Sequence, residues 1–139
     1  MEFPQTLKAT EFPQTLKATA EELVAGCREG RERENLGALY AEDAVSVEAV
    51  AMPGGGREAR GLDAIRGKHD WWEATFEEIE SSADGPYLHG DDRFSVVFEA
   101  KTRNRETGEV TQMRETATYH VNPEGKIVRE EFFWSPQVG

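Results

Sequence analysis

Apolar positions recur at helical spacing over two stretches in the first half of the chain. The segment Thr19-Ala-Glu-Glu22 is typical of a helix capping box, and it predicts a helix whose apolar side lies within residues 23–27. A short second helix is expected over residues 35–40. From residue 62 to 79 the apolar positions again fall three and four apart, which predicts a longer helix with charged residues such as Lys68 on its other faces.

The second half of the chain alternates between apolar and polar positions, as half-buried strands do. An earlier, valine-rich strand is expected over residues 44–51, ending at a glycine-rich turn. After Gly85-Pro86, strands are expected over residues 94–100, 110–121 and 126–134, joined by turn sequences. Helices with one early strand, followed by an antiparallel meander, predict an α+β fold.

The N-terminus contains a verbatim repeat, because EFPQTLKAT at residues 2–10 recurs at residues 11–19. Structural repeats run at longer periods and diverge in sequence, so this copy indicates a recent duplication or a cloning remnant. We therefore expect residues 1–18 to form an arm outside the core. A single domain is expected over residues 19–139, since this length fits one hydrophobic core.

Composition and charge exclude several classes of function. The chain has 27 acidic and 16 basic side chains and a net charge of -11, which repels nucleic acid. No apolar run reaches the ~18 residues of a membrane span, and no secretory signal precedes the domain. One cysteine and three histidines provide neither a disulfide nor a metal site. We expect a cytoplasmic protein that uses no metal and no cofactor.

Three segments carry a resemblance to a known family: LYAEDAVSVE (39–48), GLDAIRGKHDWWEATFE (61–77) and YHVNPEGKIVREEFFW (119–134). In this order and spacing they resemble a SnoaL-like domain of the NTF2-like superfamily, which also contains polyketide cyclases and ketosteroid isomerases. The resemblance implies a cone in which a curved antiparallel sheet wraps around N-terminal helices and encloses an apolar pocket. It also implies an apolar small-molecule ligand and a homodimer.

Glu48 is the first candidate for chemistry. Ketosteroid isomerases carry their general base ten positions along from the leucine of a similar segment, and the same count from Leu39 reaches Glu48. A carboxylate that faces an apolar cavity has a raised pKa, which suits proton transfer. The alternative is a solvated glutamate on a half-exposed strand.

The same resemblance predicts a changed mechanism, because the two donors of the isomerase oxyanion hole correspond to Leu23 and Ala117, which cannot donate. If Ala117 faces the cavity, Glu115 and Tyr119 face it too, since side chains alternate along a strand. Tyr119 is a candidate donor, and Glu115 is a candidate second acid beside Glu48. Alternatively, Glu115 pairs with a rim arginine and Tyr119 only packs.

His69 interrupts the apolar stripe of the long helix. It is either a proton shuttle in the pocket or a histidine that is hydrogen-bonded within the core. The remaining pocket walls follow from strand alternation and from the helix stripe. They are Tyr40, Trp72, Phe94, Val96, Phe98, Met113, Glu130, Phe132 and Trp134.

Two functions stay open at this point. One is a cofactor-independent isomerase or cyclase that performs acid–base chemistry on a carbonyl compound. The other is a non-catalytic module on the same fold, which binds a small ligand or another protein.

Overall fold

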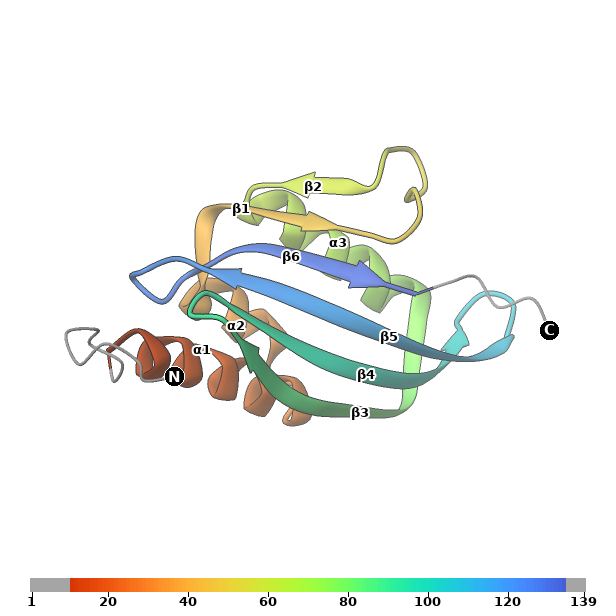
Figure 1. The fold of residues 1–139 in the computed structure, drawn as a ribbon. Coiled ribbons are helices and arrows are strands. Elements are labelled where there is room, and N and C mark those ends of the chain that lie inside the picture. Colours follow the sequence, from red (N-terminus) through yellow and green to blue (C-terminus); the bar gives the residue numbers. More distant parts are fainter. Residues whose placement is uncertain (1–10, 135–139) are drawn as a thin grey trace.

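The computed structural model describes residues 11–134 of the 139-residue chain, with side chains from Thr15 onward (Figure 1). Three helices and six strands make up this part. In chain order they are α1 (Glu11–Arg28), α2 (Glu32–Leu39), β1 (Tyr40–Val47), β2 (Glu58–Arg60), α3 (Leu62–Thr75), β3 (Phe76–His89), β4 (Arg93–Asn104), β5 (Val110–Val121) and β6 (Ile127–Phe133).

The six strands form one sheet in the order β2-β1-β6-β5-β4-β3. The sheet is mixed, because β1 and β6 run parallel while every other neighbouring pair is antiparallel. Figure 1 shows the sheet curving with all three helices on one side. Helix α1 packs against β3 and β4, whereas α3 packs against β1 and β2. The architecture is therefore the expected α+β cone, with helices at two ends of the concave face.

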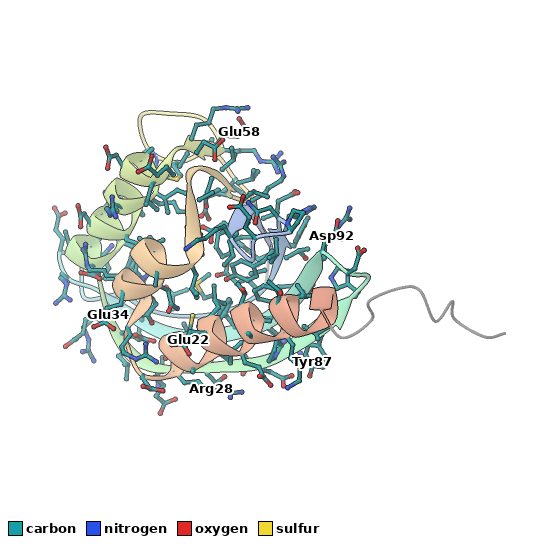
Figure 2. All side chains as sticks on the ribbon, turned by 90° about the vertical axis from the view of Figure 1, so that its left-hand side faces the viewer. Glu22, Arg28, Glu34, Glu58, Tyr87 and Asp92 are labelled. Atoms are coloured by element: carbon teal, nitrogen blue, oxygen red, sulfur yellow. The ribbon has the colours of Figure 1, made fainter. Side chains whose placement is uncertain are left out.

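The core joins the helices to the middle of the sheet. Viewed along the sheet, charged side chains such as those of Glu34, Glu58 and Asp92 lie at the periphery (Figure 2). Between the helices and the sheet the described side chains are mostly apolar. The fully buried ones include Leu23, Val24, Leu36, Ile65, Phe94, Val96, Ala117 and Ile127.

Helix α1 begins earlier than the capping box predicts. It starts at Glu11, and Leu16 lies in the core with only 2% of its surface exposed. The Thr19 hydroxyl does not cap a helix but donates to the backbone oxygen of Gly125 at 2.8 Å. The predicted helix start at Thr19 is therefore wrong, and the second copy of the repeat is largely helical. The first copy, at residues 2–10, lies outside the described residues.

Helix α3 ends sooner than its apolar stripe predicts. It stops at Thr75, and the chain continues as the long strand β3, which pairs with β4 along nearly its whole length. Ile79, the last member of the predicted helical stripe, is instead a strand residue with 38% of its surface exposed. The short strand β2 was not predicted either. Pairing with neighbouring strands overrides local preference in both segments.

Strand pairing fixes which side chains share the concave face. Phe94 is paired with Tyr119, and Phe98 with Glu115, across β4 and β5. Tyr119 is paired in turn with Glu130 on β6. Paired residues on adjacent strands project to the same side of a sheet. These five residues therefore lie on one face, as the alternation in the sequence predicts.

Candidate functional site

An ion pair between α3 and the end of β1 is the centre of the candidate site. Only 11% of the Lys68 side chain is exposed, and its Nζ donates to Glu48 Oε2 at 2.5 Å. The same ammonium group donates to the Ser46 hydroxyl. It also lies 4.8 Å from the centre of the Phe132 ring, within the range of a cation–π contact. A single cation thus connects the helix to two strands.

A second carboxylate lies deeper, next to the ion pair. Glu130 is 2% exposed and accepts hydrogen bonds from the hydroxyls of Tyr40 and Ser46, the latter at 2.6 Å. Its Oε2 is 3.8 Å from Lys68 Nζ, which is too long for a direct hydrogen bond. Lys68, Ser46 and Glu130 therefore form a chain of donors and acceptors that Tyr40 completes. Such buried networks hold their members in fixed positions when every polar atom has a partner.

Backbone pairing brings these residues together. In the parallel pair of β1 and β6, Ser46 lies opposite Glu130. Glu48 follows the last residue of β1, and its backbone N–H donates to the carbonyl oxygen of Arg57 at 2.8 Å. The Arg57 guanidinium returns a bond of 2.9 Å to the Glu48 carbonyl oxygen. The end of the strand is thus held in place, which orients the Glu48 side chain toward α3.

Glu115 is the third carboxylate on this face. The pKa of Glu115 is raised to about 7, mainly by burial and next by the negative charge of Glu48, while Lys68 partly offsets the increase. Its proton is therefore held near neutral pH, whereas Glu48 is paired with a cation. A carboxyl group with a raised pKa next to an ion-paired carboxylate is typical of sites that supply both an acid and a base.

Tyr119 is the predicted hydroxyl donor, and it lies in the core beside this network. It is 3% exposed and stacks on Phe94 with ring centres 4.7 Å apart. Burial raises its pKa well above the usual value, and the nearby charge of Glu130 adds to the effect, so the hydroxyl keeps its proton. A protonated phenol hydroxyl can donate a hydrogen bond.

His69 follows Lys68 on α3 but takes no part in the hydrogen-bonded network. It is part-buried, and burial lowers its pKa, so the ring is neutral near pH 7. Trp72, one turn further along, is 37% exposed and packs on Phe76 with ring centres 4.5 Å apart. The helix stripe therefore points toward the sheet but leaves its C-terminal aromatic residues at the surface.

A recess of about 420 Å³ opens near the C-terminal ends of β1 and β6. It is lined by Ala49, Arg57, Phe132, Phe133 and Trp134. Ala49 directly follows Glu48, and the Phe132 ring is the one that Lys68 contacts. The recess therefore lies near the chain segment that carries Glu48, although Glu48 and Lys68 are not among its lining residues. A smaller recess, of about 120 Å³, lies over β3, β4 and β5 around Lys101 and Gln112.

The structure distributes the nine predicted pocket residues over four environments. Phe132 and Trp134 line the recess. Glu130 and Tyr40 belong to the buried hydrogen-bonded network. The others either fill the core, as Phe94 and Val96 do, or are part-buried or exposed, as Phe98, Met113 and Trp72 are.

Two residues of the network were missed in the sequence, namely Lys68 and Ser46. Lys68 was assigned to the charged faces of its helix. However, it follows Ile65 by three positions and precedes Trp72 by four, the same spacing that defined the apolar stripe. A lysine at stripe spacing was therefore the available signal, and the long lysine side chain lets the ammonium group reach inward.

The described residues contain no cluster of side chains that could hold a metal ion. None of the helices in this part of the chain has the length and hydropathy required to cross a membrane. Chemically, the arrangement offers proton transfer, because a carboxyl group with a raised pKa lies near an ion-paired carboxylate and a buried cation.

A curved mixed sheet with three helices on one side and a polar site on its concave face defines an NTF2-like α+β cone. Within that superfamily the chain belongs to the SnoaL-like domain family, whose sequence model matches residues 15–134. No curated protein sequence matches the chain.

Solved structures agree with this assignment. A candidate SnoaL-like polyketide cyclase from Mesorhizobium loti is 30% identical, with 85% of this chain and 97% of that chain covered and a TM-score of 0.78. Delta 5-3-ketosteroid isomerase from Mycobacterium sp. is 21% identical, with 87% and 93% covered and a TM-score of 0.64. A Mycobacterium tuberculosis protein in complex with estradiol-17β-hemisuccinate is 18% identical, with 90% and 95% covered and a TM-score of 0.66. The last two share the fold.

Proposed function

We propose that this protein is a cofactor-independent acid–base catalyst that moves a proton within a small apolar carbonyl compound. Glu48 is the general base, and Glu115 is the acid that returns a proton to the product. The proposal rests on one observation above all: two carboxyl groups share the concave face, and the pKa of Glu115 is raised to about 7 while Glu48 is paired with Lys68. Near neutral pH, Glu115 can then donate a proton while Glu48 accepts one.

The surroundings support an apolar substrate. The recess beside Glu48 is lined by the aromatic residues Phe132, Phe133 and Trp134, which supply apolar contact area. One structural relative was solved with a steroid derivative, and another is a designed 17-OHP binder. Tyr119 and His69 stay proposed participants: the tyrosine as a hydroxyl donor, and the neutral histidine as a proton shuttle.

A non-catalytic binding module is the second candidate. The resemblance places the oxyanion donors of ketosteroid isomerases near Leu23 and Ala117, and both of these residues are buried in the core. Loss of one such donor typically costs ~10²–10³ in rate, so a protein that lost both would retain the pocket more readily than the reaction. This candidate makes the same binding prediction as the first but none about proton transfer.

Exchange of α-protons in D₂O separates the two candidates. A panel of cyclic ketones and polyketide-like diketones is incubated with the wild type and with Glu48→Gln, and deuterium incorporation is followed by NMR. We expect catalysed exchange that falls ~10²–10⁴-fold in the variant, because general-base catalysis contributes about this much.

Glu58→Gln is the matched control, since Glu58 is an exposed carboxylate on β2 that pairs with Arg60 and not with Lys68. Its exchange rate should equal that of the wild type. Background exchange in the wild type and in both variants would reject the catalytic proposal for this panel and favour the binding module.

A further inference from the structure

The geometry points to a catalytic role for Lys68. Its ammonium group binds the carbonyl oxygen of the substrate and stabilises the negative charge that develops there when Glu48 removes an α-proton. This inference deepens the proposed function and rests on it. Lys68 would thereby replace the donors that Leu23 and Ala117 cannot provide, with a formal charge in place of neutral hydrogen-bond donors.

One of the three N–H donors of the Lys68 ammonium group is not used within the described residues. Of its three hydrogens, one is directed to Glu48 and one to the Ser46 hydroxyl. Glu130 lies 3.8 Å away, beyond hydrogen-bonding distance. Among the described residues, nothing else accepts a hydrogen bond from Lys68, so the third hydrogen can be donated to a bound ligand.

Glu48 and Lys68 lie next to each other, as removal of an α-proton from a ketone requires. In a ketone, the α-hydrogen and the carbonyl oxygen belong to adjacent carbon atoms, so the group that takes the proton and the group that binds the oxygen must be neighbours. Glu48 uses Oε2 to accept the bond from Lys68, while its Oε1 accepts no hydrogen bond from the described residues. Oε1 can therefore remove the proton while Nζ contacts the oxygen.

The charges balance through the step. Glu48 Oε1 takes the proton, the electron pair of the broken C–H bond forms the carbon–carbon double bond of the enolate, and the carbonyl oxygen becomes negative. Lys68 exchanges an ion pair with the Glu48 carboxylate for an ion pair with this oxygen. Before the step the anion is the Glu48 carboxylate, and after it the anion is the enolate oxygen, while Lys68 stays positively charged. The net charge of the site therefore does not change, and the buried surroundings need not accommodate a new charge.

Burial makes the contact strong. With 11% of its surface exposed, Lys68 acts through a medium of lower polarity than water, in which a charge on a nearby oxygen is stabilised more strongly. The hydrogen bonds that run from Lys68 through Ser46 to Glu130 hold the ammonium group in place before the substrate arrives. Such preorganisation lowers the cost of charge development in the reaction.

The test uses 4-nitrophenol as the probe, because its phenolate oxygen imitates an enolate oxygen and its absorbance reports the ionisation state. The measurement is made in a Glu48→Gln background, which imitates the site after the base has taken its proton. We expect 4-nitrophenol to bind as the phenolate, with an apparent pKa lowered by about 1 unit or more relative to water. This shift is a tenfold or larger preference for the anion.

Adding Lys68→Gln to this background should abolish the shift, whereas Lys68→Arg, which keeps the charge, should retain part of it. Lys101→Gln is the matched control, because it removes the same charge at a distant position. Lys101 lies on β4 beside the smaller recess, away from the ion pair. 4-Nitroanisole, which cannot ionise, should bind all variants equally. Circular dichroism and thermal unfolding of each variant establish that it is folded.

Three outcomes would overturn the inference: an unshifted phenol pKa, a shift that Lys101→Gln reduces as much as Lys68→Gln does, or trapping of a ketone on Lys68 by borohydride. The last would identify a nucleophilic amine in place of a charged donor.

Failure of the proposed function is distinguishable from failure of this inference. Background α-proton exchange with a Lys68-dependent phenol shift would reject catalysis but keep Lys68 as the oxyanion-binding group. Glu48-dependent exchange with no phenol shift would reject only the role of Lys68.

Discussion

At the scale of single residues, the site depends on the hydrogen bonds that the buried Glu130 carboxyl group accepts. This side chain is 2% exposed, and a buried carboxyl group without partners would be strongly destabilising. Its two oxygens accept hydrogen bonds from Tyr40 and from Ser46, and Ser46 in turn accepts one from Lys68. The residues proposed for chemistry thus share a support that is fixed by strands β1 and β6.

Tyr40→Phe removes one donor from Glu130 without changing the shape of the core. We expect it to lower the free energy of unfolding by about 1–3 kcal/mol, the cost of leaving a buried acceptor unpaired. Urea denaturation monitored by tryptophan fluorescence measures the difference.

Tyr87→Phe is the control, because Tyr87 also donates to a carboxylate, Asp84, at 2.8 Å but is 51% exposed. Water can replace the lost bond there, so the free energy of unfolding should change by less than about 0.5 kcal/mol. Equal costs for the two variants would show that the buried bond to Glu130 contributes nothing of its own.

At the scale of elements, helix α1 shows what the duplicated segment does. Leu16, in the second copy of EFPQTLKAT, packs in the core with Leu23 and Val24. Leu7 is the equivalent residue of the first copy, which stays predicted to lie outside the core. Identical sequences are therefore expected to contribute differently to stability.

Leu16→Ala should lower the free energy of unfolding by about 2–4 kcal/mol, because it removes buried apolar groups and leaves a cavity. Leu7→Ala should leave it unchanged within about 0.5 kcal/mol. Thermal and urea unfolding of the two variants give the comparison. A similar loss in both would mean that the first copy is packed as well.

The elements also separate what the sequence could predict from what it could not. Alternation over residues 94–100 and 110–121 predicted β4 and β5, since those strands are buried on one face only. Strand β3 was missed because its glutamates and serines have low strand preference and the helical stripe of α3 continues into it. Only pairing with β4, which is distant in sequence, makes this segment a strand.

The candidate site, like the fold, could be predicted from the sequence only in part. Strand alternation correctly put Glu115, Tyr119 and Glu130 on one face, because the period of two is a local property. The pairing of Glu48 with Lys68 could not be predicted, since it depends on how α3 lies against β1 and on how far a lysine side chain extends. The roles assigned to these residues stay predictions.

At the scale of the whole molecule, the fold brings together four segments that are far apart in the sequence. The end of β1, the middle of α3, and strands β5 and β6 each contribute at least one polar group to the concave face. The chain carries a net charge of -11, yet its most buried network contains a lysine. That cation lets two carboxylates lie close together, while a third, Glu115, keeps its proton to about pH 7.

The raised pKa of Glu115, next to the ion-paired Glu48, is the central claim, and it is tested most directly by titrating Glu115. Carbon-13 NMR of glutamate side-chain carboxyl groups follows each signal with pH, and Glu115→Gln identifies the signal that disappears. We expect an apparent pKa near 7 for Glu115 in the wild type. It should be lower in Glu48→Gln, because the negative charge that raises it is gone, and unchanged in Glu99→Gln, which alters an exposed residue of β4. A Glu115 signal that titrates in the ordinary range of a glutamate, with no response to Glu48→Gln, would contradict the account.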